Sequence, residues 1–237
     1  FIAYFGAWFS NVAIYTMLVD FGSSEMAISV VTAMHFLPAI LIAPFSGAII
    51  DRVKIKPLMI TLLATELLMT ILFLTIDNKD DLWLLMILIF VRMSAASMFF
   101  STEMSLLAKL LRGKPLQMAN EIHSIIWSFT YAAGMAVSGF VVNWYGVKTA
   151  FMIDAVIFAI ALIVFIRIDF VVKASTATDK ILQLVKDGFT YIKNDKIILH
   201  LIFLHSSVGL TSFDALITIL AKNEYKYIIS VPLAIGL

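Results

Sequence analysis

The sequence predicts an all-α membrane protein, a helical bundle that crosses a bilayer several times. Of its 237 residues, 62% are apolar and 14% are charged, whereas a soluble domain is roughly 45–50% apolar and about 25% charged. Apolar runs of about 20 residues, the length with which a helix crosses a hydrocarbon core of about 30 Å, recur between short polar breaks. Runs such as residues 82–91 do not alternate polar and apolar side chains, which excludes the strands of a membrane barrel.

Composition and motifs exclude several function classes. The formal net charge of +1 leaves no basic excess for binding nucleic acid. Without cysteine there is no disulfide, zinc-thiolate site or thiol nucleophile. Neither a nucleotide-binding glycine loop nor a Ser, His and Asp set at catalytic spacing occurs, so we expect no ATP motor and no enzyme. We also expect no cofactor and no metal, because His200 and His205, five residues apart, lie on different helix faces.

Seven membrane-spanning helices and the start of an eighth are expected. They cover residues 2–19, 26–50, 57–76, 82–107, 119–142, 149–168 and 197–221, and the eighth begins near residue 228. Since the chain opens inside an apolar run and stops inside another, we expect both ends to be cut. Residues 1–168 then form an N-terminal six-helix domain, and residues 197–237 form the start of a C-terminal domain.

Residues 169–196, between these domains, form the longest polar stretch. Ile181, Val185, Phe189 and Ile192 recur there at helical spacing, with lysines on the other side. This pattern predicts an amphipathic helix along the cytoplasmic surface of the membrane. A plain solvated linker is the alternative.

The distribution of Lys and Arg predicts the orientation, because short basic loops stay in the cytoplasm. Of the 17 basic residues, twelve follow the second, fourth and sixth spans, four lie in the loops on the other side, and Arg92 lies within a span. We therefore expect a multi-pass protein of the cytoplasmic membrane with its N-terminus on the cytoplasmic side.

The loops carry an internal repeat. After the second span, a glycine is followed by an acidic residue four positions on and by a lysine nine positions on, and after the fifth span the same order recurs with an amide. The two sets are Gly47, Asp51 and Lys56, and Gly139, Asn143 and Lys148. Because three spans are an odd number, the second copy enters the membrane from the other side. This predicts a 3+3 inverted repeat, the plan of many secondary carriers.

The first copy of this loop predicts a conformational latch on the cytoplasmic side. Gly47 lets neighbouring helices approach, and Asp51 can accept hydrogen bonds from the N-terminus of another helix. Arg52, Lys54 and Lys56 would hold the turn at the anionic inner face of the bilayer.

Three segments carry a family resemblance: residues 36–52, 99–120 and 146–155. In that order they resemble the helix-two end with its signature loop, the helix-four to helix-five connection and the helix-six start of the major facilitator superfamily. The likeness is greatest to its drug, macrolide and siderophore exporters, and it covers nearly the whole chain. It implies a bundle of major facilitator type that moves small molecules by alternating access.

The sequence departs from the family pattern at two places. The signature loop usually has glycine and then arginine where this chain has Lys54 and Ile55. The helix-five antiporter motif usually has a Gly-Pro pair, whereas residues 134–139 keep two glycines and lack the proline.

Ionisable residues at mid-membrane depth are functional candidates, because a charge there costs several kcal/mol unless it is paired or hydrated. Glu66 and Arg92 each lie about ten residues into a span and could face one another. The resemblance implies that Arg92 belongs to a motif linked with proton coupling. We predict that Glu66 and Arg92 couple a proton to transport, with His35 as an alternative proton site. A static ion pair and a structural histidine are the alternatives.

Other polar residues are given structural roles by their position. Asp154 is expected nearer the outer face, as a helix-terminal or mouth-lining group. Glu103 is expected to pair with Lys109 or Arg112 toward the cytoplasm, and His123 shows no pairing with a carboxylate on its helix face.

Nineteen Phe and twelve Met suit an adaptable cavity for amphipathic molecules. Asn11 and Tyr15, four residues apart on one helix face, are the candidates for polar contacts within it. The sequence thus predicts a monomeric, proton-coupled exporter of drugs or siderophores, whose partners are the small molecule, protons and the bilayer. An importer of the same superfamily and a non-transporting scaffold or sensor subunit stay open.

Overall fold

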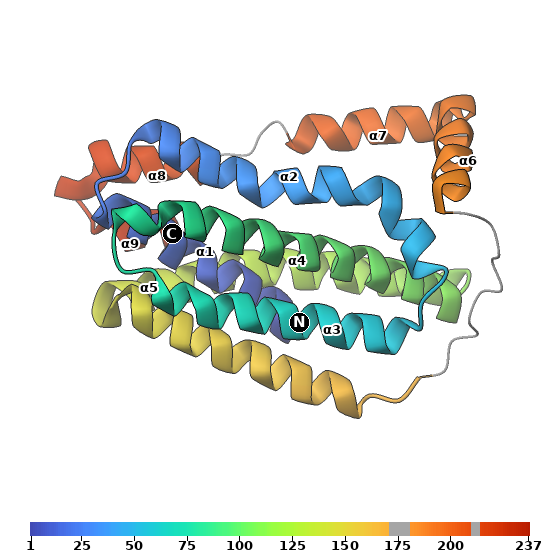
Figure 1. The fold of residues 1–237 in the computed structure, drawn as a ribbon, viewed down its shortest axis with the longest axis horizontal. Coiled ribbons are helices and arrows are strands. Elements are labelled where there is room, and N and C mark those ends of the chain that lie inside the picture. The colour runs from blue at the N-terminus through green and yellow to red at the C-terminus, as the bar shows by residue number, and fades with distance from the viewer. Residues whose placement is uncertain (171–180, 210–213) are drawn as a thin grey trace.

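Helices make up nearly all of the chain in the computed structural model, which describes residues 1–170, 181–209 and 214–237 (Figure 1). No strand occurs within these ranges, so the all-α prediction is confirmed. The α-helices are α1 (Ile2–Asp20), α2 (Glu25–Ile50), α3 (Ile55–Leu72), α4 (Leu82–Leu110), α5 (Lys114–Arg167), α6 (Ile181–Asn194), α7 (Lys196–Gly209), α8 (Asp214–Asn223) and α9 (Val231–Gly236). Short 3-10 turns cover Phe73–Thr75, Lys79–Asp81 and Tyr225–Tyr227.

Helix α5 doubles back on itself at Gly146. Its 54 residues would measure about 80 Å as one straight helix, far more than a bilayer is thick. Gly146 has φ 82° and ψ 167°, a conformation that only glycine adopts readily. The two arms of α5, residues 114–145 and 147–167, therefore run antiparallel (Figure 1). They correspond to the predicted fifth and sixth spans.

Five of the described helical segments are long and apolar enough to cross a membrane, and α5 does so once with each arm. Together they form the six helices predicted for the N-terminal half, with bounds shifted by a few residues. Helix α2 bends toward α4 at its C-terminal end (Figure 1). Pro44, which cannot donate a backbone hydrogen bond inside the helix, explains the bend.

Helix α1 is the most buried of these spans and packs between the two arms of α5. Glycines make this close packing possible, one on each side. A Cβ atom at Gly6 would meet Oδ1 of Asp154 at 2.7 Å, and a Cβ atom at Gly134 would meet the carbonyl oxygen of Phe5 at 3.1 Å. Ser10, Asn11 and Thr16 of α1 are consequently buried in the bundle.

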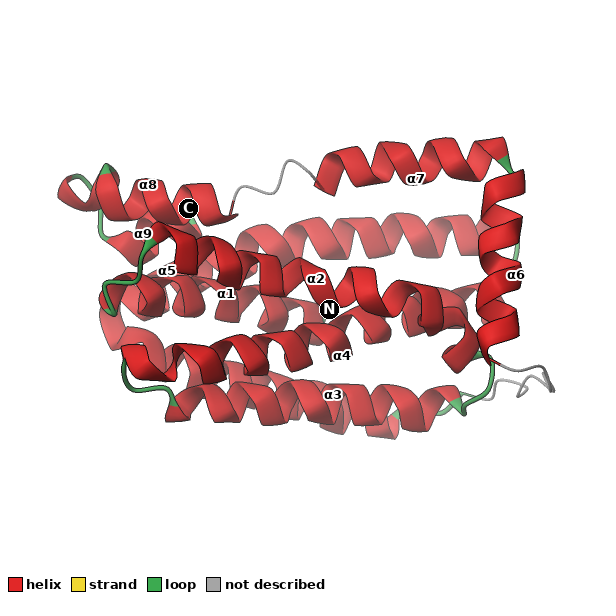
Figure 2. Ribbon diagram, turned by 45° about the horizontal axis from the view of Figure 1, so that its top comes forward, coloured by secondary structure: helices red, strands yellow, loops and turns green. Residues whose placement is uncertain are grey.

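The segment after the six-helix bundle is described in part. Helix α6 runs across the end of the bundle, roughly perpendicular to the spans, as an amphipathic helix on a membrane surface would (Figures 1 and 2). Residues 210–213, inside the predicted seventh span, lie outside the described residues, and on either side of them are α7 and α8. One continuous span over residues 197–221 stays a prediction, as do the domain boundaries.

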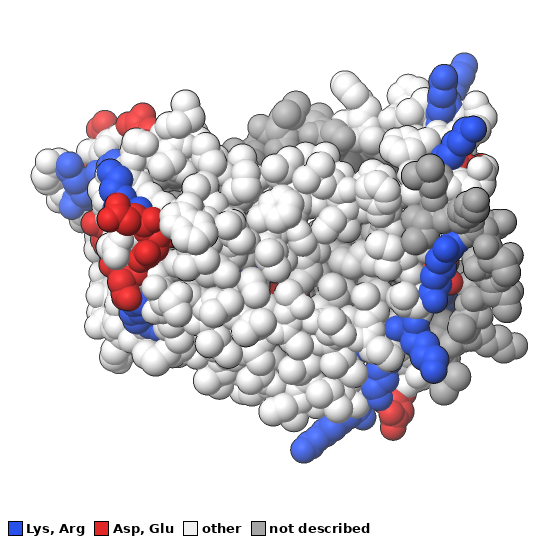
Figure 3. Space-filling model, in the orientation of Figure 1, with Lys and Arg blue, Asp and Glu red and all other residues white. Residues whose placement is uncertain are grey.

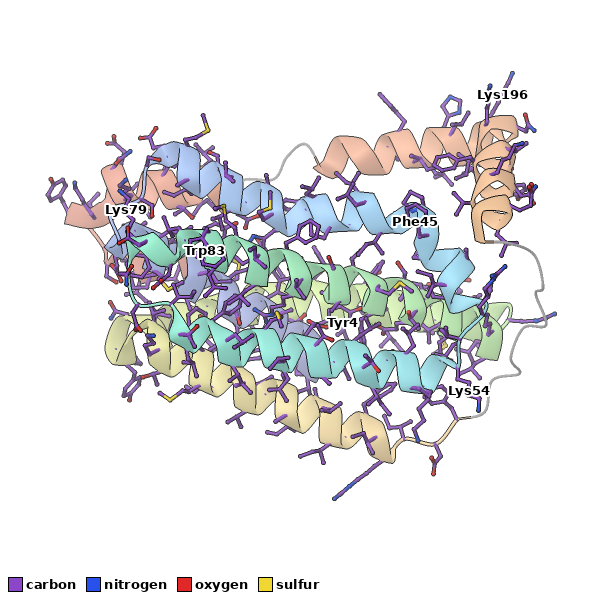
Figure 4. All side chains as sticks on the ribbon, viewed as in Figure 1. Tyr4, Phe45, Lys54, Lys79, Trp83 and Lys196 are labelled. Carbon is purple, nitrogen blue, oxygen red and sulfur yellow. The ribbon has the colours of Figure 1, made fainter. Side chains whose placement is uncertain are left out.

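Charged side chains gather at the two ends of the bundle and leave a band between them largely free (Figure 3). We call the end with the α2–α3 turn and the α4–α5 turn the basic end, and the end with residues 77–81 and Gly146 the opposite end. Lys54 and Lys196 lie at the basic end, and Lys79 lies at the opposite end (Figure 4). The two copies of the loop motif thus lie at different ends, as an inverted repeat requires; the symmetry relating the two groups of three helices stays a prediction.

Candidate functional site

Arg92 and Asp154 form an ion pair in the interior of the bundle. Nη2 of Arg92, on α4, lies 3.0 Å from Oδ2 of Asp154, on the second arm of α5. The two side chains are 4% and 0% exposed. Ser10 of α1 donates a hydrogen bond to the same carboxylate oxygen, and Gly6 leaves the space that the other oxygen occupies. Three helices therefore meet at one buried carboxylate.

This pairing corrects two expectations. Arg92 forms its ion pair with Asp154 and not with Glu66, and Asp154 is buried between helices and not at a helix end. The physical reason is that the two helical segments begin at the same end of the bundle. Helix α4 and the second arm of α5 both start at the opposite end, so Arg92 lies about 15 Å and Asp154 about 12 Å from it by helical rise. The flexible Arg92 side chain spans this difference in depth.

The surroundings of Arg92 are apolar. Its Cζ atom lies 5.1 Å from the ring centroid of Phe158 and 5.6 Å from that of Phe73. Both rings are fully buried. Cation–π attraction adds to the ion pair, and the exclusion of water strengthens every charge interaction there.

Glu66 brings a second carboxylate to this site. It lies on α3, is 3% exposed, and is within electrostatic range of both Arg92 and Asp154. None of the ion pairs among the described residues includes Glu66. The buried charge cluster, which we define as Glu66, Arg92 and Asp154, thus combines two acidic groups with one basic group.

His35, Tyr15 and Asn11 lie apart from this ion pair. The ring of His35 stacks on that of Tyr15 with centroids 5.7 Å apart, and Nδ1 of His35 lies 3.0 Å from the carbonyl oxygen of Val31. The hydroxyl group of Tyr15 lies 3.1 Å from Oγ1 of Thr32. Asn11 and Tyr15 are 7% and 1% exposed, so both are enclosed by helices in this structure.

The α2–α3 turn carries the predicted latch residues at the basic end. Oδ1 of Asp51 accepts a hydrogen bond from Nζ of Lys109 at 2.9 Å. Lys109 lies in the last turn of α4, so the donor is a lysine side chain and not, as expected, a helix N-terminus. Since both side chains are partly exposed, such a contact contributes about 0.2–1 kcal/mol and breaks easily.

The remaining latch residues are distributed around this contact. Nζ of Lys56 donates a hydrogen bond of 2.9 Å to Oδ1 of Asp169, a residue that lies just after the end of α5. This hydrogen bond and the ammonium charge hold the pKa of Asp169 below its usual range. Gly47 has open space where a Cβ atom would lie, so it does not serve a close helix contact among the described residues. Arg52 and Lys54 are exposed in the turn.

At the opposite end, α8 and α9 contact the six-helix bundle. Nζ of Lys222 donates to the carbonyl oxygen of Ser23 at 2.6 Å, and Nδ2 of Asn223 donates to Oε1 of Glu25 at 3.1 Å. Gly236 of α9 packs so closely on the first arm of α5 that an added Cβ atom would lie 2.9 Å from Cα of Gly139. Contacts between the two parts of the chain are therefore close at this end.

A second cluster of titratable side chains lies toward the basic end. Oη of Tyr4 donates to Oε2 of Glu103 at 2.6 Å, and Nδ1 of His123 lies 3.4 Å from Oε1 of the same carboxylate. The expectation that Glu103 pairs with Lys109 or Arg112 is wrong for the contacts among the described residues, and the carboxylate beside His123 lies on another helix. These contacts join three different helices, α1, α4 and α5, so no spacing on one helix could have predicted them.

Metal binding has no candidate in the part of the chain that the structure describes, where no three His, Asp or Glu side chains gather as ligands.

Comparison with known proteins identifies the architecture. The profile of the Major Facilitator Superfamily matches residues 1–237. The chain is 26% identical over 204 residues to the uncharacterized MFS-type transporter YfiS of Bacillus subtilis (strain 168). The match covers 84% of the chain and 48% of that protein, so the chain spans about half the length of this curated relative.

Proposed function

The chain belongs to the major facilitator superfamily, and on that premise we propose that it is part of a secondary transporter that exports amphipathic small molecules in exchange for protons. In this proposal residues 1–168 are the N-terminal domain, and residues 197–237 begin its counterpart. Substrate binds between the domains near mid-membrane, and rocking of one domain against the other alternates access.

The charge balance of the buried cluster carries the proposal of proton coupling. Two carboxylates and one guanidinium sum to a charge of −1, and all three side chains are at most 4% exposed. An uncompensated charge in such a place costs several kcal/mol. Binding one proton makes the cluster neutral, so the cluster is suited to take up a proton and to release it again.

In this proposal Arg92 can form an ion pair with either of two carboxylates. With a proton on Glu66, Arg92 pairs with Asp154, as in this structure. With the proton on Asp154, Arg92 would turn to Glu66 on α3, and the contact between α4 and the second arm of α5 would loosen. A proton that changes the partner of Arg92 therefore changes which helices are held together, which is what coupling requires.

Contacts at the two ends of the bundle could open and close in turn as the partner of Arg92 changes. The Asp51–Lys109 contact, between α2 and α4 at the basic end, is partly exposed and weak enough to open and close. The contacts of α8 with the six-helix bundle at the opposite end include hydrogen bonds of 2.6 and 3.1 Å, and α9 packs closely on α5. We propose that the carrier alternates by opening one end while closing the other.

The experiment uses the full-length protein that contains this chain, reconstituted in liposomes with an imposed pH gradient. The probes are ethidium as a lipophilic cation, a macrolide and a catechol siderophore. Proton-driven flux of one probe, lowered about tenfold or more by Glu66→Gln and by Asp154→Asn, is the expected result. Glu121→Gln is the matched control, because this exposed carboxylate accepts a hydrogen bond from Gln117, one turn away on the same helix.

Other outcomes assign the protein differently. Undiminished pH-driven flux in Glu66→Gln would remove this residue from the mechanism. Accumulation inside rather than expulsion would make the protein an importer. Absence of flux for every probe, with folded protein in the membrane, would favour a scaffold or sensor subunit.

A further inference from the structure

Glu103 lacks the partner that the other ion-paired carboxylates have. In the described residues, Asp51, Asp77 and Asp169 each pair with a lysine, and Asp154 pairs with an arginine. The neighbours of Glu103 are instead the phenol of Tyr4 and the imidazole of His123. A lysine or arginine is always charged near neutral pH, whereas imidazole is charged only when it holds a proton.

The charge of this group therefore depends on one exchangeable proton. With a proton on Nδ1 of His123, the imidazolium and the Glu103 carboxylate form a neutral pair across 3.4 Å. Without it the group carries a charge of −1. Apolar rings surround the pair: the His123 ring lies 5.4 Å from that of Tyr4, edge-on, and 5.5 Å from that of Phe100. Aromatic rings thus pack against the imidazole from two other helices.

The group is also only partly enclosed by protein. Side chains of Glu103 and His123 are 26% and 12% exposed, so the helices do not seal them off. Tyr4 and Glu103 line a cavity of about 480 Å³ whose wall includes Leu63 of α3. Glu66 lies on α3 one turn beyond Leu63, on the same helix face. Figure 4 shows Tyr4 in the middle of the bundle, in projection between α3 and α4.

We propose that Tyr4, Glu103 and His123 form a second proton-binding site, which loads protons from the basic end toward Glu66. A proton from water binds Nδ1 of His123 and passes to Oε1 of Glu103. Glu103 then releases this proton toward the cavity and regains its charge, while the hydroxyl group of Tyr4 keeps its own proton and, by donating it to Oε2, holds the carboxylate in place. The loading role rests on the proposed function, whereas the binding of a proton at this site does not.

Other charged groups lie on the helices packed around the site. They include Glu66 on α3, Lys109 on α4, and Glu121 and Arg167 on α5; the same helices and α1 also carry Asp20, Lys56, Arg92, Lys114, Lys148 and Asp154. Lys109 is paired with Asp51, Glu121 accepts from Gln117, and Arg167 lies at the exposed end of α5. Glu66 is the one that the cavity approaches.

The first test measures proton binding in the full-length protein without any substrate. Trp127 lies one helical turn after His123, so a proton on His123 should quench the fluorescence of Trp127. The ring of Trp127 also contacts that of Trp8, with centroids 5.4 Å apart. Trp83 and Trp144, which are 61% and 67% exposed, are replaced by Phe to reduce background, as is any tryptophan outside this chain. As the pH is lowered from about 8 to about 5, the range in which imidazole side chains can change their charge, we expect a sigmoidal quench.

Variants assign the quench to the site. His123→Gln should abolish it, and Glu103→Gln should reduce its amplitude about threefold or more, since the carboxylate no longer stabilises the imidazolium. Tyr4→Phe, which keeps the ring, should leave the quench but slow proton-driven flux. Glu121→Gln should behave as the parent. A quench that persists in His123→Gln, or that Glu103→Gln leaves unchanged, would overturn the proposal.

The second test separates loading from the proposed function. In liposomes, Glu103→Gln should slow proton-driven ethidium flux about tenfold, while Glu66→Gln should abolish the flux and keep the quench. Normal flux in Glu103→Gln would overturn the loading role. No flux in the parent protein, with the quench intact, would overturn the proposed function and leave the proton-binding site in place.

Discussion

At the scale of single residues, the buried charge cluster decides between a static ion pair and a switch. If Glu66 replaces Asp154 as the partner of Arg92, Asp154→Asn and Glu66→Gln should each destabilise the protein by about 1 kcal/mol. The double variant leaves Arg92 buried without a carboxylate and should cost about 3–5 kcal/mol, more than the sum of the two. Unfolding of the purified protein in detergent measures both.

The opposite result would assign a static role. If Asp154→Asn alone cost the full amount and Glu66→Gln added little, Arg92 would depend on one carboxylate only. The matched control is Asp77→Asn, which removes the exposed partner of Lys148 and should change stability by less than about 1 kcal/mol.

A pH-dependent contact at the basic end gives a second residue-scale prediction. Lys56 lowers the pKa of Asp169 by a hydrogen bond and by its charge. The contact is therefore intact at neutral pH and is lost as the pH falls through this lowered pKa. Lys56→Gln should return the pKa of Asp169 toward about 3.9. Carbon-13 NMR of the carboxyl group measures the change, and Lys54→Gln, in the same turn, should leave the value unchanged.

The sequence predicted how deep a residue lies along its span but not which residue on another helix it contacts. Depth along a span follows from counting, so Glu66 and Arg92 could be placed near mid-membrane. Partners depend on which faces of distant helices meet, and the contacts Ser10–Asp154 and Tyr4–Glu103 join residues about a hundred or more positions apart. One signal was present: counting from Gly146 would have put Asp154 near the depth of Arg92.

At the scale of elements, glycine positions separate backbone requirements from packing. Gly146 adopts φ 82° with no atom within 4 Å of an added Cβ, so Gly146→Ala tests the backbone alone. It should cost about 1–3 kcal/mol, because this region of φ and ψ strains any other residue. Gly47→Ala is the control: the space is open and the residue is helical, so stability should rise by about 0.5–1 kcal/mol. Thermal unfolding in detergent compares the two, and equal effects would contradict the explanation.

Apolar runs and polar breaks were sufficient to predict the first six spans, since the length of a span is set by the bilayer itself. The turn at Gly146 was marked by this glycine and by a few polar residues around it, including Asn143, Lys148 and Thr149, within an otherwise apolar stretch. The seventh span could not be assessed in the same way, because residues 210–213 lie outside the described ranges. Amphipathic spacing located α6, whereas its position across the end of the bundle depends on contacts with the bent end of α2.

At the scale of the whole molecule, alternating access predicts that joining the two parts of the chain at the opposite end stops transport. Glu25 and Asn223 are in hydrogen-bond contact there, and the 237 residues contain no cysteine. Glu25→Cys with Asn223→Cys, in full-length protein freed of any other cysteine, should react with a short thiol cross-linker. Flux should then fall about tenfold or more, and cleaving the linker should restore it.

The control pair, Asp77→Cys with Lys148→Cys, lies at the same end but wholly within the six-helix bundle. Rocking of rigid domains leaves distances inside each domain unchanged, so this cross-link should form equally well and leave the flux unchanged. Complete cross-linking of the first pair with undiminished flux would show that the two parts need not separate at this end. Loss of flux with the control pair would show that residues 77 and 148 must separate during transport, which would contradict the rocking of a rigid domain.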